Sequence, residues 1–198
     1  YMQNAQILVL KNIKIDSVSL RGIIFSNYLD FFMNFFKKDK LNLLFSGNSN
    51  IESTYKNFSE LSVEEITSIK KIKLENFKYS ETKNSFELNI IDHRSYHFLI
   101  LQNEKLIAYS RLVPPSSNFR NLTLERFCVA NAYKGRGISR ILIKYIIDEA
   151  ANLFPKEVLS LSSLEDTKLF YEKFGFSTNY FTHDENGNLH YFMTRKFR

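Results

Sequence analysis

The sequence has little of several residues that would by themselves define a class of protein. It contains one cysteine, no tryptophan, three prolines and six glycines in 198 residues. A single cysteine excludes an internal disulfide framework and is typical of a reducing compartment. A signal-peptide pattern and a membrane-length apolar run are lacking too, since the most apolar N-terminal window, residues 23–36, includes Ser26, Asp30 and Asn34. We therefore expect a cytoplasmic protein without a membrane span.

The charge balance is modestly positive. Lysine and arginine number 27 against 21 acidic residues, which gives a formal net charge of +6. This charge suits an anionic ligand such as a nucleotide or a phosphate ester. Because no dense basic block is present, specific nucleic-acid binding is the weaker interpretation. The histidines at positions 93, 97, 183 and 190 have no metal-ligand spacing, and we predict no metal.

The length predicts one domain with an appendage. The clearest linker is Ser46-Gly47-Asn48-Ser49-Asn50. We therefore predict an N-terminal extension over residues 1–50, with a strand and a phenylalanine-rich amphipathic helix, and a main domain over residues 51–198. The apolar helix face would dock on a partner or membrane, or pack on a folded domain, and packing is the favoured alternative.

Hydrophobic periodicity and turn signals predict alternating strands and helices in the main domain. The predicted helices are 62–76, opened by a Ser62–Glu65 capping box, 138–153, and a last one from about 166 to 174 closed by Gly175. The predicted strands are 55–58, 96–101, 106–113, 122–130, 158–161, 177–181 and 189–194. This order predicts an α/β (α+β) fold with a mixed sheet that is partly antiparallel and partly crossover-connected.

One glycine turn stands between a predicted strand and a predicted helix. Phe127 to Ala130 is apolar, Gly135-Arg136-Gly137 follows, and a helical pattern begins at Ile138. Glycine lets such a loop approach an anion closely, and the N–H groups at a helix start can bind it. Lys134, Arg136 and Arg140 add positive charge, so the turn predicts a phosphate site, with a solvated surface turn as the alternative.

These segments together resemble the GNAT acyltransferase superfamily. Lys134-Gly135-Arg136-Gly137-Ile138-Ser139 matches its cofactor-binding pattern Arg/Gln-x-x-Gly-x-Gly/Ala, with lysine and serine at the two ends. AYSRLVPP at 108–115, ERFCV at 125–129, LFYEKFGF at 169–176 and DENGNLHYFM at 184–193 resemble its ElaA-like branch. The resemblance covers roughly residues 53–198. It implies the GNAT fold, a mixed central sheet of about six to seven strands with flanking helices and an acyl-CoA site at the splayed middle strands.

The resemblance also implies the donor site. Main-chain groups of Phe127, Cys128 and Val129 would bind pantetheine, and the turn would bind the pyrophosphate of acetyl-CoA, the expected co-substrate. The turn residues are Lys134, Gly135, Arg136, Gly137, Ile138, Ser139 and Arg140. Strand alternation predicts Cys128 on the face opposite Glu125 and Val129, as a buried, inert thiol.

Two catalytic roles follow from the same resemblance. Tyr171 would be the general acid that protonates the departing sulfur, and Glu125 would deprotonate the amine directly or through water. Each has an alternative: Tyr171 would pack its ring in the core, and Glu125 would pair with Arg126 or another cation.

The implied function is an acyl-CoA-dependent N-acyltransferase, in first place an acetyltransferase acting on a primary amine by direct attack. The alternatives are a non-catalytic GNAT-fold module that binds acyl-CoA or a protein, and thirdly an acyl-homoserine-lactone-type synthase. The expected partners are acyl-CoA and an amine acceptor that the sequence does not identify, and a homodimer is an open alternative.

Overall fold

The computed structural model of the chain describes residues 50–77, 88–116 and 119–197. The predicted N-terminal extension lies outside these residues except for Asn50, and its boundary with the main domain stays a prediction. None of the helices in the described part of the chain is long and apolar enough to cross a membrane.

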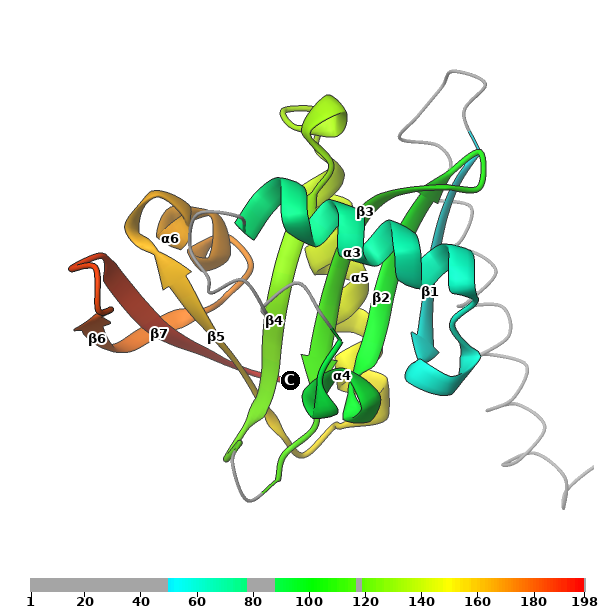
Figure 1. Cartoon of the computed structure of the whole chain (residues 1–198). Coiled ribbons are helices and arrows are strands. Elements are labelled where there is room, and N and C mark those ends of the chain that lie inside the picture. Colours follow the sequence, from blue (N-terminus) through cyan, green and yellow to red (C-terminus); the bar gives the residue numbers. More distant parts are fainter. Residues whose placement is uncertain (1–49, 78–87, 117–118, 198) are drawn as a thin grey trace, which may run out of the picture. The chain divides into compact units, whose positions relative to one another are not determined.

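Seven strands of the described residues form one sheet, in the order β1-β2-β3-β4-β5-β7-β6 (Figure 1). Neighbouring strands are antiparallel except for β4 and β5, which are parallel and joined by the crossover helix α5. The elements are β1 Ile51–Asn57, η1 Phe58–Glu60, α3 Val63–Phe77, α4 Ile90–Arg94, β2 Tyr96–Gln102, β3 Lys105–Val113, β4 Leu122–Val129, η2 Asn131–Tyr133, α5 Ile138–Leu153, β5 Val158–Leu164, α6 Glu165–Glu172, β6 Ser177–His183 and β7 Leu189–Lys196. The predicted mixed α/β fold with six to seven strands is confirmed.

Helices α3 and α5 cover opposite faces of the sheet (Figure 1). The capping box predicted for α3 is present, because Ser62 N–H donates to Glu65 Oε2 and Glu65 N–H donates to Ser62 Oγ. Buried Ile69 and Ile72 of α3 pack in one cluster with Leu99 of β2 and Tyr109 of β3. On the other face, Tyr145 of α5 meets the ring of Phe98 edge to face at 5.6 Å. Burial of both helices on the sheet fixes the frame in which β4 and β5 stand.

The middle of the sheet is splayed. Strands β4 and β5 pair only at Leu122–Leu159 and Thr123–Ser160, whereas β5 and β7 pair along seven positions. Beyond Thr123 the two strands diverge (Figure 1). The edge of β4 that faces β5 is therefore without a ladder partner there in the described residues, and its backbone polar groups are available to a ligand.

A β-bulge in β4 changes which side chains share a face. Tyr109 lies opposite Cys128 and Arg111 lies opposite Glu125, so β4 takes three steps where β3 takes two. The extra residue is accommodated near Arg126, whose φ is +55°. Because directly opposed residues of neighbouring strands share a face, Glu125 and Cys128 lie on the same face. The prediction that simple alternation separates them, and puts Val129 with Glu125, is wrong for this reason.

Candidate active site

The glycine turn has the backbone geometry of an anion site. Gly135 and Gly137 have φ of +76° and +80°, in the left-handed region, and Gly137 is the N-cap residue of the 16-residue helix α5. A residue with a Cβ pays about 1–2 kcal/mol there. The N–H groups of residues 135–139 donate to no acceptor within the described residues. Unpaired N–H groups around a left-handed turn, at the positive end of a long helix, form a site for phosphate oxygens.

Three cationic side chains surround this turn. Lys134, Arg136 and Arg140 are all exposed to solvent. The guanidinium of Arg136 lies over the ring of Tyr133, 5.5 Å from its centroid. Exposed cations on long side chains can follow a diphosphate without the desolvation cost of buried charges.

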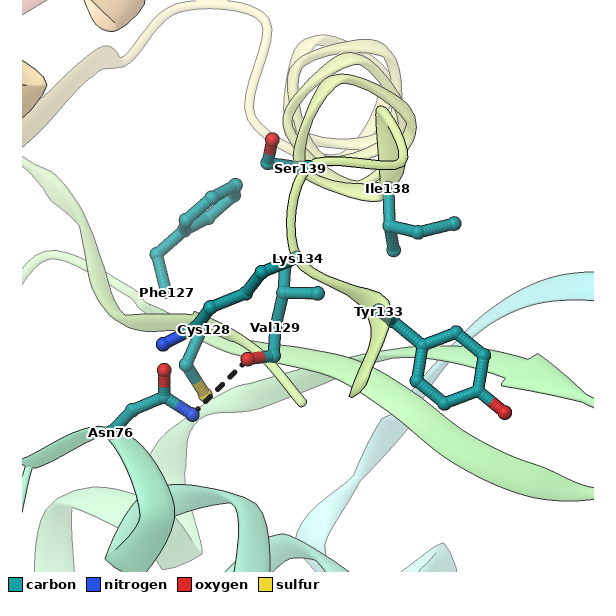
Figure 2. Close-up of a pocket in the computed structure, with 9 residues that line it drawn as sticks. Asn76, Phe127, Cys128, Val129, Tyr133, Lys134, Ile138 and Ser139 are labelled. Atoms are coloured by element: carbon teal, nitrogen blue, oxygen red, sulfur yellow. Dashed lines mark hydrogen bonds between the residues drawn. The ribbon is translucent and has the colours of Figure 1, made fainter. Parts of the chain in front are cut away.

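A cavity of about 210 Å³ connects the turn with β4 (Figure 2). The predicted donor-site residues mostly line it, and the lining set is Asn76, Phe127, Cys128, Val129, Tyr133, Lys134, Gly135, Ile138 and Ser139. Figure 2 shows the three β4 residues between Asn76 on one side and Ile138 and Ser139 on the other. The structure thus brings the two predicted halves of the site together, with Arg136, Gly137 and Arg140 outside the lining.

Asn76, near the end of α3, belongs to this cavity although the sequence did not indicate it. Its Nδ2 donates to the carbonyl oxygens of Ile72 at 2.9 Å and Val129 at 3.2 Å. The second bond ties the end of α3 to the last residue of β4. Its partner is 53 positions away, and no local pattern reveals such a contact.

Tyr171 lies beside this cavity, near the C-terminal end of α6. Its ring packs edge to face on Phe127, with centroids 5.9 Å apart, and also contacts Phe170 and Phe176. Its hydroxyl has no hydrogen-bond partner in the part of the chain that the structure describes. Burial raises the pKa of Tyr171 above its usual value. The phenol therefore keeps its proton at neutral pH and can donate it.

Glu125 is held by a buried cation. Its Oε2 accepts from Arg111 Nε at 3.0 Å and Nη2 at 2.6 Å. Arg111 Nη1 in turn donates to Asp92 Oδ1 at 2.8 Å, and Lys73 Nζ lies 3.9 Å from Asp92 Oδ2. The pairing alternative predicted for Glu125 is therefore present, with Arg111 as the cation. Oε1 accepts no hydrogen bond from the described residues, and the Glu125 side chain is 28% exposed.

Cys128 is the buried, inert thiol that the sequence predicts. Its Sγ donates to Tyr109 O at 3.6 Å, and burial raises the pKa of the thiol to about 12. A thiol with that pKa has almost no thiolate at neutral pH, so its place in the cavity is one of packing.

The histidines differ in environment. His97 is buried between Tyr109 Oη and the carbonyl of Asp92, each 2.9 Å away, and burial lowers its pKa. His190 lies on β7 between Ser162 and Asp184. From the sequence, these histidines are noted only because they lack metal-ligand spacing. In the structure, His190 contacts a residue of β5 and a residue of the β6–β7 hairpin.

Comparison with protein families gives a match over most of the chain. The model of the acetyltransferase (GNAT) domain matches residues 58–197. Among curated proteins, the UPF0039 protein sll0451 of Synechocystis is 24% identical over 144 residues, covering 72% of this chain and 94% of that protein. Protein ElaA of Escherichia coli is 24% identical over 100 residues, covering 50% of this chain and 65% of ElaA.

Solved structures agree with the fold. The crystal structure of E. coli ElaA superposes with a TM-score of 0.66 at 21% identity, covering 74% of this chain and all of that one. An acyl-CoA N-acyltransferase from Pseudomonas aeruginosa gives 0.66 at 20% identity, covering 74% and 99%. An aminoglycoside 6′-N-acetyltransferase complexed with coenzyme A gives 0.59 at 13% identity, covering 72% and 96%. At these identities the structural likeness establishes the fold, and the resemblance to the ElaA-like branch is confirmed by the sequence match.

Proposed function

The chain belongs to the GNAT acetyltransferase family, and on this premise we propose that it transfers an acetyl group from acetyl-CoA to a primary amine. The observation that carries the proposal is the donor site. Unpaired N–H groups at the start of α5 open into a cavity that is walled by the unpaired half of β4. One end of this arrangement suits a pyrophosphate, and the other suits an extended chain with amide groups.

The residues proposed for the donor each have a defined task. N–H groups of Gly135 to Ser139 hold the pyrophosphate, with Lys134, Arg136 and Arg140 balancing its charge. Main-chain groups of Phe127, Cys128 and Val129 bond the pantetheine arm as a neighbouring strand would. The bulge at Arg126 supports this, because it interrupts the regular pairing of β3 with β4 next to this stretch.

The transfer itself proceeds by direct attack of the amine on the thioester carbon. Tyr171 gives its proton to the sulfur as the C–S bond breaks, and burial of this phenol among aromatic rings supports that role. Glu125, directly or through a water molecule held at Oε1, takes a proton from the incoming ammonium group. The free Oε1 and the partial exposure of the Glu125 side chain support this assignment.

A non-catalytic acyl-CoA-binding module is the second candidate. Leu164, at the N-cap of α6, is 44% exposed on the β5 wall of the splay, where a side-chain amide would be expected to bind the pantetheine arm. Leucine makes no hydrogen bond there, so the β5 wall contributes less to donor binding. The two candidates share the donor site and differ in whether an acceptor amine is used.

The first experiment compares thermal unfolding with saturating acetyl-CoA and with free adenosine. A ligand at 100 times its Kd adds about 2.7 kcal/mol to the free energy of unfolding. We expect acetyl-CoA to raise Tm and adenosine to leave it within error. The absence of any shift with acetyl-CoA would overturn both candidates.

The second experiment measures release of free CoA thiol from acetyl-CoA over a panel of amines. The panel holds polyamines, arylalkylamines, aminoglycosides, peptide N-termini and lysine peptides. Amine-dependent thiol release with an acetylated product of the expected mass supports the transferase. Binding of acetyl-CoA without release on any member of the panel would favour the non-catalytic module.

A cytoplasmic location is proposed with this function. The free, buried Cys128 is the single cysteine of the sequence and accords with a reducing compartment.

A further inference from the structure

One face of the sheet runs from Glu125 across β5 to β6. Thr123 and Ser160 are directly opposed, so Glu125 and Ser162, each two residues further along, lie on that same face. Ser162 is opposed by Phe192 of β7, and Phe192 by Tyr180 of β6. Helix α6 lies against the other face, where Lys168 sits over the ring of Tyr191 at 5.2 Å.

This face is open to solvent over β5, β7 and β6. Ser162 and Leu164 of β5 are exposed, and Tyr180 of β6 is 57% exposed. Because β4 and β5 are parallel at Leu122–Leu159 and Thr123–Ser160, Glu125 and Ser162 are level with one another. They stand on the two walls of the splay, with the β4 bulge beginning just beyond Glu125.

Ser162, His190 and Asp184 are in contact with one another in that order. Its Oγ lies 3.3 Å from Nδ1 of His190, and Nε2 of His190 lies 3.3 Å from Oδ2 of Asp184. Asp184 is fixed by the β6–β7 hairpin, where its Oδ1 accepts from the N–H groups of Asn186 and Asn188 at 2.9 and 2.8 Å. Its Oδ2 also accepts from Asn188 Nδ2 at 2.9 Å.

These contacts define where protons sit in the cluster. The Asn188 side chain and then backbone N–H groups stabilise the carboxylate, and they lower the pKa of Asp184 to about 2. An ionised carboxylate only accepts hydrogen bonds, so Nε2 of His190 carries its hydrogen toward Asp184. Nδ1 of the neutral ring then has a lone pair directed at Ser162, and the Ser162 hydroxyl can donate to it. Serine, histidine and carboxylate in this order form a chain along which a proton moves away from the serine.

Acetylation of a protonated amine has two protons to remove. The ammonium nitrogen loses the first before it can attack, and the second leaves the nitrogen of the tetrahedral intermediate. Glu125 is one acceptor, and its carboxylate also balances the buried pair Arg111 and Lys73. A second acceptor on the facing wall would let both steps occur without unbalancing that cluster.

We propose that Ser162 and His190, with Asp184 behind them, take the second proton of the acceptor nitrogen. This inference rests on the proposed acetyl transfer and names the proton path of that same site. As the tetrahedral intermediate collapses, the nitrogen gives its proton to Ser162 Oγ and the Ser162 hydroxyl proton passes to His190 Nδ1. The C–S bond breaks, and the sulfur takes the proton of Tyr171. Amide and free CoA form, Glu125 and the imidazolium return their protons to solvent, and Tyr171 is reprotonated from water.

The test compares Ser162→Ala and His190→Ala with two matched controls, Ser177→Ala and His183→Ala, which are exposed positions on β6. Wild type and variants are assayed with acetyl-CoA and the best amine of the panel. We expect kcat to fall about 100-fold in the first two variants, a typical size for a lost proton transfer. KM for acetyl-CoA and Tm should stay within twofold and within 2 °C, and the controls should retain full activity.

Imidazole added to His190→Ala separates proton transfer from a structural role. We expect imidazole to raise kcat of His190→Ala at least tenfold and to leave kcat of Ser162→Ala unchanged. Unchanged kcat in both variants of an active wild type would overturn the proton path and leave the proposed transferase standing. A wild type that binds acetyl-CoA but transfers to no amine would overturn both. An acetyl group found on Ser162 by mass spectrometry would overturn the path as well, because it would make Ser162 a nucleophile.

Discussion

Tyr171 and Glu125 sit in environments of opposite polarity, one on each side of the thioester position proposed here. The phenol is enclosed by Phe127, Phe170 and Phe176, while the carboxylate contacts a guanidinium and is partly exposed. An apolar enclosure favours the neutral form of a group, and a cationic neighbour favours the charged form of a carboxylate. These surroundings suit the proposed roles of Tyr171 as proton donor and Glu125 as proton acceptor.

At Tyr171 the prediction is a loss of rate without a loss of donor binding. Tyr171→Phe removes the hydroxyl but keeps the ring contact with Phe127. We expect kcat to fall about 100-fold and the acetyl-CoA Kd from calorimetry to stay within twofold. The control is Tyr145→Phe, a half-buried tyrosine of α5 that packs on Phe98. Equal kcat in wild type and Tyr171→Phe would remove Tyr171 as the acid.

Gly137 allows a prediction about the anion site itself. A Cβ at Gly137 or at Gly187 would meet nothing within 4 Å, so Gly→Ala acts there only through the left-handed backbone. Both variants should lose about 1 kcal/mol of unfolding free energy in urea melts. Gly137→Ala alone should also weaken acetyl-CoA binding, by about tenfold, because a change in the backbone at this position displaces the unpaired N–H groups of the turn. Equal acetyl-CoA affinity in the two variants would contradict the assignment of the turn to pyrophosphate.

Among the elements, α3, α4, β3 and β4 are tied together by one buried charge cluster. Lys73, Asp92, Arg111 and Glu125 contribute one charge each, and the first three side chains are at most 2% exposed. Two cations facing two carboxylates leave the cluster neutral. Because positive and negative charges are equal in number, their attraction offsets the cost of removing them from water. The loss of one member leaves an unpaired buried charge.

Removal of Asp92 should therefore be among the most destabilising single changes. Asp92→Asn keeps the shape but leaves Arg111 and Lys73 without their shared carboxylate. We expect the free energy of unfolding in urea to fall by about 3–5 kcal/mol. The exposed pair Lys168–Glu172 gives the matched control, and Glu172→Gln should cost about 0.5 kcal/mol or less. A similar small cost for Asp92→Asn would mean that the cluster is not coupled.

The elements that the sequence predicts well are those with local signals. The helix over Ile138–Leu153 and the Ser62 capping box each depend on neighbouring residues, and both are present. The bulge at Arg126 has no such local signal in the sequence. An arginine seldom has a positive φ, and here the pairing of β4 with its neighbouring strand holds it in that conformation. The alternation of side chains between the two faces of β4 is interrupted at that residue. The face predicted for Cys128 is therefore wrong.

The site divides in the same way. The glycine turn and β4 could be predicted as one donor site because the resemblance and the local motif agree on them. Asn76 and His190 could not, since each has one partner at least 28 positions away, Val129 and Ser162 respectively, that only the folded sheet brings close. The roles of Tyr171 and Glu125 stay predictions until the kinetic variants are measured.

For the molecule as a whole, the buried titrating groups predict loss of stability in mild acid. Burial lowers the pKa of His97 in the folded state, so the unfolded chain binds a proton first as pH falls below about 6.5. Burial tends to raise the pKa of Asp92, but Arg111 and hydrogen bonds outweigh it and lower that pKa. Its contribution is complete above about pH 4 and is lost as pH falls through the folded value.

Urea midpoints measured from pH 7.5 to about 2 should therefore fall in two stages, the second of them below about pH 4. Each group contributes a slope of at most about 1.4 kcal/mol per pH unit. His97→Gln should remove the first stage, between pH 6.5 and the lowered folded pKa, and retain the second. A pH-independent midpoint from 7 to 5 in the wild type would contradict the first stage.

The two halves of the sheet meet through only two residue pairs, Leu122–Leu159 and Thr123–Ser160. On the side that faces β5, residues 124–129 of β4 have no ladder partner in the described sheet, and we propose that acetyl-CoA binds there. Bound acetyl-CoA should slow hydrogen–deuterium exchange along this stretch and at the turn, and leave β1 unchanged. Bound acetyl-CoA would then make the sheet more rigid, and its rigidity would rise on binding and fall on release in each catalytic cycle.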